Sequence, residues 1–404
     1  MSSVLDSVTD ERGALVAETA LPARLRALHG RRVLHVGKYY PPHMGGMETH
    51  VRALCEELQR FLSVEVLVAG DERRTTEEHI GGVKVTRAGT LLNLNAAPVC
   101  PSLARRIRAA AADLVHIHLP NPTAIIAYFA SGASGASGHS GRLVLTYHSD
   151  IIRQKILGKA FWPILRRALD RADAIIVGSP NYMETSPALR LFKEKCRVIP
   201  FGIPHEEFQR ADALEVERLR GLYGERVVLG VGRLVYYKGF EYLIRAMKEV
   251  RGHLLLVGDG PLREELRREA FAAGVAERVT FLHGVEDVRP FYHAADVFAL
   301  PSIARSEAFG IVQLEAMAAG LAVVNTQLDS GVTFVSPDGL TGLTVPPSDS
   351  DALAAALNSL LDDRSLRAKF GAAGRLRVER EFSLEKMTRR TLELYADVLE
   401  SSSS

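Results

Sequence analysis

Short apolar runs alternate along the chain with longer segments in which apolar residues recur every three or four positions. In the first part of the chain the short runs predict strands buried on both faces, and Met47–Gln59 and Ser102–Ala112 predict helices. Such alternation is typical of a parallel sheet with helices on both faces. The expected strands are Val33–Val36, Val64–Val68, Leu114–Ile117, Leu143–Tyr147 and Ile175–Val177.

The same alternation begins again in the second part of the chain. The expected strands there are Val227–Val231, Leu254–Val257, Val279–Leu282, Val297–Leu300 and Ala322–Val324, and the expected helices are Glu241–Val250, Arg263–Ala273 and Ile311–Ala319. Two sheets of about five or six strands each fit the length. The predicted fold class is therefore α/β, with two Rossmann-like, doubly wound parallel-sheet domains facing across a cleft. Such sheets bind ligands at the carboxyl ends of their strands.

A charged, irregular stretch, Pro200–Glu217, separates the two series of strands and marks the expected seam. Phe129–Arg142 is rich in Gly, Ala and Ser, so we expect a surface loop there. The predicted organisation is an N-terminal tail at 1–30, a first domain at 31–205, a second domain at 218–380 and a C-terminal tail at 401–404.

Composition narrows the class of protein. The 404 residues are 47% hydrophobic and 24% charged, which excludes collagen-like, coiled-coil and wholly disordered chains. The formal net charge of +2 gives no nucleic-acid signature. Three scattered cysteines (Cys55, Cys100 and Cys196) argue against a disulfide framework or a clustered metal site. No apolar run is long enough to span a membrane, and the acidic N-terminus does not fit a signal peptide, so we expect a cytoplasmic protein.

A paired glycine follows the first expected strand. Gly45 and Gly46 lie just before the helix that begins near Met47. Glycines at a helix N-terminus let a ligand approach the backbone, whose free N–H groups can bind phosphate. A tight turn with nothing bound explains the glycines equally well, and no Gly-x-Gly-x-x-Gly fingerprint occurs there.

Two cations follow the first strand of the second series. Arg233 and Lys238 lie between Val227–Val231 and the next helix. Cations at the carboxyl end of a strand suit a diphosphate whose negative charge grows as it leaves. Solvated surface cations are the alternative.

The most specific stretch runs from Leu300 to Gly320. Glu307 precedes the expected helix Ile311–Ala319, and Glu315 lies within it. A carboxylate before the turn suits sugar hydroxyls, and one inside the helix suits a ribose diol. Backbone N–H groups that open the helix suit phosphate oxygens. Charge that only complements the helix dipole is the alternative, but a charge such as Glu315 within an apolar run is costly unless it is paired. The N–H groups concerned belong to Phe309, Gly310 and Ile311.

Histidines mark the ends of two strands in the first series. His148 follows Leu143–Tyr147 and is placed to donate a hydrogen bond to a sugar hydroxyl or a leaving phosphate, although a solvated loop histidine is the simpler interpretation. His116 and His118 alternate along one strand. Without a cysteine or acidic cluster beside them, core and cleft-lining roles are favoured over metal ligation.

The stretch 151–170 carries five basic residues and one acidic residue, together with Phe161 and the only tryptophan, Trp162. A basic amphipathic stretch with aromatic residues can bind an anionic membrane surface. A solvated helix face over the core is an equal alternative.

Taken in this order, the motifs resemble retaining glycosyltransferases of family 4, which have the two-domain GT-B fold. The strongest elements are the Glu307/Glu315 pair, the Gly-Arg…Lys-Gly segment at 232–239 and Gly258-Asp259-Gly260-Pro261. The resemblance runs from about residue 32 to the end of the chain. Many relatives carry Gly-Gly-x-x-Glu where this chain has Asn325 to Asp329.

The resemblance implies a role for each motif. Gly45 and Gly46 would face the donor diphosphate, which Arg233 and Lys238 would stabilise as it leaves. Glu307 would hold the transferred hexose, Glu315 the ribose, and His148 would contact the donor sugar. Backbone N–H groups would meet sugar and phosphate, the base would lie near His283, Gly284 and Val285, and the helix Leu384–Leu399 would pack back on the first domain. The N–H groups are again those of Phe309, Gly310 and Ile311.

The resemblance also implies the reaction: transfer of a hexose with retention, without a metal or other cofactor. The donor would be a nucleotide-diphosphate sugar, GDP-mannose before a UDP-hexose, and the acceptor a lipid-linked sugar or growing polysaccharide at the inner membrane face. A nucleotide-sugar epimerase or a phosphorylase is an alternative function that has the same fold but a different reaction. A non-catalytic sugar-binding protein has no use for paired phosphate-binding cations.

Overall fold

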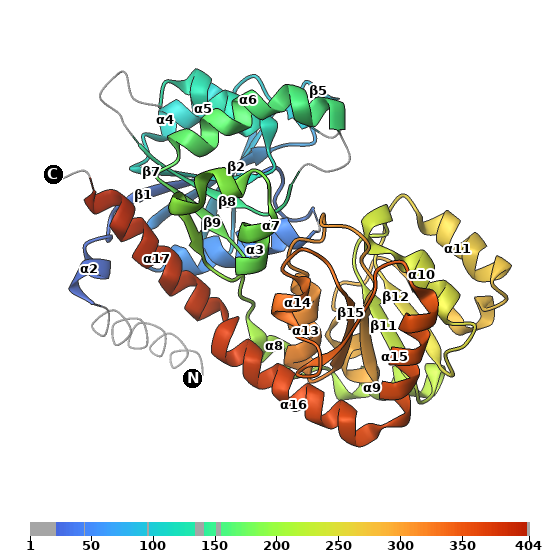
Figure 1. Cartoon of the computed structure of the whole chain (residues 1–404). Coiled ribbons are helices and arrows are strands. Elements are labelled where there is room, and N and C mark those ends of the chain that lie inside the picture. The colour runs from blue at the N-terminus through green and yellow to red at the C-terminus, as the bar shows by residue number, and fades with distance from the viewer. Residues whose placement is uncertain (1–21, 44, 95–96, 134–140, 151–154, 402–404) are drawn as a thin grey trace, which may run out of the picture.

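The computed structural model describes residues 22–43, 45–94, 97–133, 141–150 and 155–401. Figure 1 shows two α/β halves side by side, the N-terminal half in blue to green and the C-terminal half mostly in yellow to red. The long helices α16 (Arg364–Glu381) and α17 (Leu384–Glu400) run in succession past both halves.

The N-terminal half is built on an eight-stranded sheet in the order β10-β9-β8-β7-β1-β2-β4-β3, parallel except for β3 against β4. The prediction of five or six strands is wrong here. Strand β3 (Thr76–Ile80) escapes the apolar pattern because four of its five residues are exposed at the sheet edge. The other strands are β1 (Arg32–Val36), β2 (Ser63–Ala69), β4 (Val83–Ala88), β7 (Leu114–Leu119), β8 (Arg142–Tyr147), β9 (Ala174–Val177) and β10 (Cys196–Val198). The main helices are α3 (Gly46–Leu58), α4 (Leu103–Ala110), α5 (Pro122–Ser131), α6 (Lys155–Arg171) and α7 (Pro180–Thr185), and β5 (Leu92–Leu94) and β6 (Ala97–Val99) form a separate hairpin.

The C-terminal half is built on a six-stranded, fully parallel sheet in the order β13-β12-β11-β14-β15-β16. All five predicted strands are confirmed, and α13 (Ile311–Ala319) has the predicted bounds. The strands are β11 (Val227–Val231), β12 (His253–Val257), β13 (Val279–Leu282), β14 (Val297–Leu300), β15 (Ala322–Thr326) and β16 (Gly342–Val345). The main helices are α9 (Ala213–Tyr223), α10 (Phe240–Ala246), α11 (Arg263–Ala272), α12 (Arg289–Ala294) and α15 (Ser350–Asp362).

Each sheet reverses its strand order at one point. Strand β1 lies between β2 and β7, and β11 lies between β12 and β14. A crevice opens outside the carboxyl ends of the strands at such a reversal, because the connections leave in opposite directions. The loops at 37–43, 232–239 and 301–310, which follow β1, β11 and β14, are therefore the ones placed to bind a ligand.

The chain passes between the halves twice, and the two passages are hydrogen-bonded to each other. Ile203 N–H donates to Phe382 O (3.0 Å), and Leu384 N–H donates to Ile203 O (3.0 Å). Beyond this crossing α17 packs on α3 of the N-terminal half, as the family resemblance implied. The sequence placed residues 1–30 in a tail, but Leu25 and Leu28 are buried and α2 (Ala23–Arg26) lies against α17.

The expected surface loop at 129–142 is only partly a loop. Phe129 to Ser131 form the last turn of α5, because Phe129 packs against the core beside Tyr128. Arg142 begins β8. Residues 134–140, which carry most of the small-residue repeat, lie outside the described residues.

We predict that Gly202→Ala lowers the free energy of unfolding by about 1–3 kcal/mol, as overpacking does. An added Cβ would lie 2.4 Å from the Ser383 carbonyl oxygen, at the crossing where neither backbone is free to move. In the matched control Gly221→Ala, on an exposed face of α9, the Cβ meets no atom within 4 Å and should stabilise by about 0.5–1 kcal/mol. Urea denaturation measures both, and equal effects would contradict a tight crossing.

Candidate active site

A buried ion pair joins the loops that follow β11 and β14. Lys238 Nζ lies 2.7 Å from Glu307 Oε2, and each side chain is only about a tenth exposed. The Ser302 hydroxyl donates to the same carboxylate oxygen at 3.1 Å. Buried charges are stable only when paired and hydrogen-bonded. The pair thus fixes a lysine and a carboxylate at the strand reversal of the second sheet.

Two further cations face each other across the halves. Arg233 is exposed directly after β11, and Lys38 follows β1. Burial lowers the pKa of Lys38, and the Arg233 charge lowers it further, whereas Glu48 opposes the shift. Because like charges repel, an anion bound between Arg233 and Lys38 would be stabilised by both. The sequence analysis singled out Arg233 but missed Lys38, which only the fold brings near.

The glycine pair lies where the two halves meet. A Cβ on Gly46, the first residue of α3, would lie 3.9 Å from Ile311 Cδ1, the first residue of α13. Gly46 therefore faces the N-terminus of α13 across the boundary, whereas a Cβ on Gly45 would meet Glu48 Oε2 of the same half.

The start of α13 presents free donors. Among the described residues, no acceptor bonds to the backbone N–H of Phe309, Gly310 or Ile311. Gly310 has φ 77°, and a Cβ there would lie 2.7 Å from Gln313 Nε2 and 2.8 Å from Leu300 Cδ2, so the turn requires glycine. Three unpaired N–H groups at the positive end of a helix are suited to an anion.

Glu315 lies one turn into α13 and accepts a hydrogen bond of 2.6 Å from the Tyr292 hydroxyl. Burial raises the pKa of the Glu315 carboxyl, while Tyr292 and the nearby Lys238 charge hold it down. The structure therefore brings Lys238 close to both glutamates that the sequence singled out.

His148 follows β8, is almost fully buried and connects to α13 through aromatic rings. Its ring centroid lies 5.0 Å from that of Phe201, which lies 4.9 Å from that of Phe309. The solvated-loop interpretation of His148 is therefore wrong, because its ring is packed among others. By contrast, the segment His283 to Val285 follows edge strand β13, which is separated from β14 by the two strands β12 and β11, and His283 and Gly284 are exposed.

The fold also gathers histidines that the sequence analysis did not connect. His116 and His118 are fully buried, as expected of core residues, but His35, His50 and His148 lie beside them. His35 and His50 gave no signal because strand β1 and helix α3 reach this place from elsewhere in the sequence.

Arg305, missed in the sequence, ties the halves together next to the site. It donates to the Thr185 carbonyl (2.8 Å) and hydroxyl (3.2 Å) and pairs with Asp150 at 3.2 Å. Its guanidinium also lies over the Tyr182 ring, 5.2 Å from the centroid. Arg305 shares a loop with Glu307, and Asp150 lies two residues after His148, so this contact joins the two loops that carry candidate catalytic residues.

The departure from the Gly-Gly-x-x-Glu pattern has a structural explanation. Asn325, at the carboxyl end of β15, donates to Gln313 Oε1 and to Ser336 O, both at 2.9 Å. Thr344 donates to Asn325 Oδ1 at 2.7 Å. Asn325 thus anchors α13 to β15 through the side chain of Gln313. The glycines of the Gly-Gly-x-x-Glu pattern have no side chain that could make this contact.

The basic stretch 151–170 is only partly described: 151–154 and the side chains of 155–160 lie outside the described residues. In the described part, which begins at residue 161, Phe161 and Trp162 are half-buried against the core, and the Arg167 guanidinium lies over the Phe129 ring. The aromatic residues are thus partly used by the fold. Within the described part of the chain, no helix is long and apolar enough to cross a membrane.

Known proteins with similar sequences and structures identify the family and the fold. The family model "Glycosyltransferase Family 4" matches residues 44–207, and "Glycosyl transferases group 1" matches residues 217–377. The chain is 32% identical to O-antigen chain mannosyltransferase C of Escherichia coli, over 92% of this chain and 100% of that protein. It is also 32% identical to a GDP-mannose-dependent α-(1-6)-phosphatidylinositol monomannoside mannosyltransferase of Mycolicibacterium smegmatis, over 85% of this chain and 92% of the relative.

Among solved structures, HepE of Anabaena in complex with UDP superimposes with a TM-score of 0.74 at 21% identity, covering 91% of this chain and 100% of HepE. Two facing, mainly parallel-sheet halves of this kind have the GT-B fold, so the protein has the two-domain GT-B architecture. By sequence, the chain belongs to glycosyltransferase family 4 and is a glycosyltransferase.

We predict that Lys238→Met and Glu307→Gln each lower the free energy of unfolding by about 3–5 kcal/mol, because each leaves a buried partner without its counterion. The double variant should recover a large part of that loss, since neither charge remains. A double-mutant cycle by urea denaturation measures the coupling. Strictly additive losses would contradict a direct buried pair.

We predict a pH-dependent effect for Glu315→Gln. A carboxyl whose folded pKa is raised is stabilising when protonated, and this contribution is lost as pH rises above the unfolded value of 4.5. Glutamine keeps an acceptor for Tyr292 and never ionises. Relative to the parent protein, the variant should therefore gain stability as pH rises above 4.5, over the range in which the folded carboxyl loses its proton. Tyr292→Phe should steepen the pH dependence of the parent, and a difference that does not vary with pH would contradict the burial of this carboxyl.

Proposed function

We propose that this glycosyltransferase transfers a hexose from a nucleotide-diphosphate sugar to a lipid-linked or polysaccharide acceptor in the synthesis of cell-surface glycans. Transfer proceeds with retention at the anomeric carbon and requires no metal. The observation that carries the proposal is the buried Lys238–Glu307 pair, set at the strand reversal of the second sheet beside the free N–H groups of α13.

The diphosphate binds between the halves. Arg233 and Lys238 supply positive charge, and the backbone N–H groups of Phe309, Gly310 and Ile311 supply donors. Gly46 leaves room for the phosphates opposite α13, and Gly45 precedes it at the N-terminus of α3. Fixed donors and cations of this kind stabilise charge that develops on a leaving group and replace a divalent metal in that role.

The sugar and nucleoside occupy the two sides of the diphosphate. Glu307, held by Lys238 and Ser302, accepts hydrogen bonds from the hexose, and His148 donates to it from the first half. Glu315 accepts from the ribose diol. The base lies toward His283, Gly284 and Val285 at the edge of the sheet, where His283 and Gly284 are exposed.

The chemistry follows from this placement. The bond between the anomeric carbon and the diphosphate oxygen breaks, leaving positive charge on the sugar and negative charge on the phosphate. The acceptor hydroxyl attacks from the same face, and the departing phosphate takes its proton. The contribution of Arg233 and Lys238 is to stabilise the diphosphate as it leaves.

Relatives support a particular donor and acceptor. The E. coli relative is an O-antigen chain mannosyltransferase, and the M. smegmatis relative is GDP-mannose-dependent and acts on a phosphatidylinositol mannoside. GDP-mannose is therefore the favoured donor, with a UDP-hexose next. A lipid-linked acceptor also suits contact of the basic stretch 151–170 with the anionic inner face of the plasma membrane.

The decisive test is donor turnover in excess EDTA with GDP-mannose, GDP-fucose, UDP-glucose, UDP-galactose and UDP-GlcNAc. We expect slow hydrolysis of GDP-mannose at a rate that EDTA does not change. Lys238→Met should reduce it by about 10²–10³-fold, as loss of a transition-state donor does. The matched control Lys248→Met, on an exposed face of the same half, should leave it unchanged. No turnover across the panel, together with no rise in melting temperature with GDP or UDP, would overturn the proposal.

A further inference from the structure

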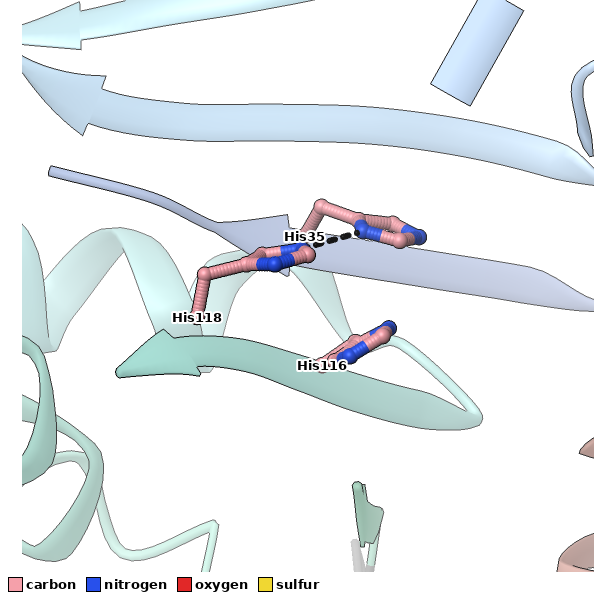
Figure 2. Close-up of side chains that lie close together, drawn as sticks. All are labelled: His35, His116 and His118. Atoms are coloured by element: carbon pink, nitrogen blue, oxygen red, sulfur yellow. Dashed lines mark hydrogen bonds between the residues drawn. The ribbon is translucent and has the colours of Figure 1, made fainter. Parts of the chain in front are cut away.

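Five histidines lie on one face of the first sheet and against the helices that cover it: His35, His50, His116, His118 and His148, all buried. Figure 2 shows three of them: His35 on β1 lies over His116 and His118 on β7. His35 and His116 are register partners in the sheet, and His116 and His118 point to the same side because they are two residues apart.

Two hydroxyl groups, one on a threonine of β8 and one on a tyrosine of α17, are hydrogen-bonded to the histidines. His116 Nε2 lies 2.6 Å from the Thr146 hydroxyl, and His116 Nδ1 lies 2.6 Å from the Tyr395 hydroxyl. The same Tyr395 hydroxyl lies 3.2 Å from His35 Nε2. One hydroxyl therefore links two imidazoles that do not bond to each other.

The connection continues to the candidate active site. His35 Nδ1 lies 3.0 Å from His118 Nε2, and His118 Nδ1 lies 3.1 Å from His148 Nε2. Thr146, His116, Tyr395, His35, His118 and His148 thus form one unbranched chain of hydrogen bonds. No described residue bonds to the remaining nitrogen of His148, Nδ1.

Neutral imidazoles allow this chain only two states. Burial lowers the pKa of His35 to about 3 and moves the pKa of His116, His118 and His148 well below the usual value. A neutral ring has one N–H donor and one acceptor nitrogen, and a hydroxyl has one donor. If any link reverses, its neighbour must reverse too, so all four rings carry the proton on Nδ1 or all four carry it on Nε2.

Thr146 selects between the two states. Among the described residues, His116 is the only hydrogen-bond partner of the Thr146 hydroxyl, which is fully buried. If His116 donated through Nε2, the buried Thr146 proton would have no acceptor, which is unfavourable. Thr146 therefore donates to His116 Nε2, and every later bond then runs from Nδ1 to the next acceptor.

We propose that this chain holds His148 as the Nδ1–H tautomer and so keeps its free nitrogen as a hydrogen-bond donor at the candidate active site. His116, Tyr395, His35 and His118 are then positioning residues. The inference rests on the proposed function in one respect: an Nδ1–H group is what His148 needs to donate to a hydroxyl of the donor sugar.

A metal site is the competing explanation. Nitrogens of His35, His116 and His118 lie within 4.8 Å of one another, as do those of His50, His118 and His148. Yet the facing nitrogens along the chain are only 3.0–3.1 Å apart, a normal hydrogen-bond distance and shorter than the about 3.3 Å that separates two nitrogens bound to one tetrahedral zinc ion. Both nitrogens of His118 are also already engaged, so hydrogen bonds explain the spacing better than a shared ion.

The test is ¹⁵N NMR of the full-length protein labelled on histidine, without substrate, at about pH 7. The four chain histidines should all show the Nδ1–H tautomer, although free neutral histidine in water prefers Nε2–H. Finding Nε2–H at any of the four, a cationic ring or a metal-shifted resonance with stoichiometric bound metal would overturn the proposal. Because no substrate is present, this result is independent of whether the donor assay succeeds.

A variant tests the coupling directly. Tyr395→Phe removes the hydroxyl that ties His35 to His116 and Thr146, so His35, His118 and His148 should change together to the Nε2–H tautomer that free neutral imidazole prefers. Tyr128→Phe is the matched control, because the buried Tyr128 hydroxyl has no partner among the described residues, and it should leave all four tautomers unchanged. Unchanged tautomers in a folded Tyr395→Phe protein would overturn the proposal. If that variant does not fold, the spectrum of the parent protein decides alone.

Discussion

The side-by-side crossing of two backbone segments between the halves is the constraint on which the rest of the structure depends. Gly202 has no side chain, so the chain leaving the first sheet can lie against Ser383 as the chain returns. Backbone hydrogen bonds on both sides of Ile203 hold this contact. Since both passages are fixed together, the carboxyl ends of the two sheets face each other, and Gly46 comes close to Ile311.

The same crossing carries the C-terminal helix to the first sheet. Helix α17 begins at Leu384, directly after the crossing, and its Tyr395 reaches the histidines of β1 and β7. Helix α17 is therefore connected to the site by hydrogen bonds that run from Tyr395 through His35 and His118 to His148. Helix α13 borders the site from the opposite half. The fold thus links a structural contact at residue 202 to the orientation of a candidate catalytic side chain.

Much of the fold was predictable because parallel strands buried on both faces leave continuous apolar runs, as in Val227–Val231. Strand β3 was missed because an exposed edge strand needs no apolar face. In the site, Lys238 and Glu307 were predicted from their places at strand ends, where chemistry is expected. Lys38, Arg305 and the His35–Tyr395 contact were not predictable, since their partners come from distant segments and no local pattern marks them.

If the active site lies where the two halves meet, one nucleoside diphosphate binds against both halves at once, and hydrogen–deuterium exchange with saturating GDP or UDP in EDTA measures this binding. We expect one of the two nucleotides to protect peptides covering 45–48, 232–238 and 307–315 in the same sample, because the diphosphate would lie between them. Protection confined to one half of the molecule, or protection of none of these peptides with either nucleotide, would contradict the account.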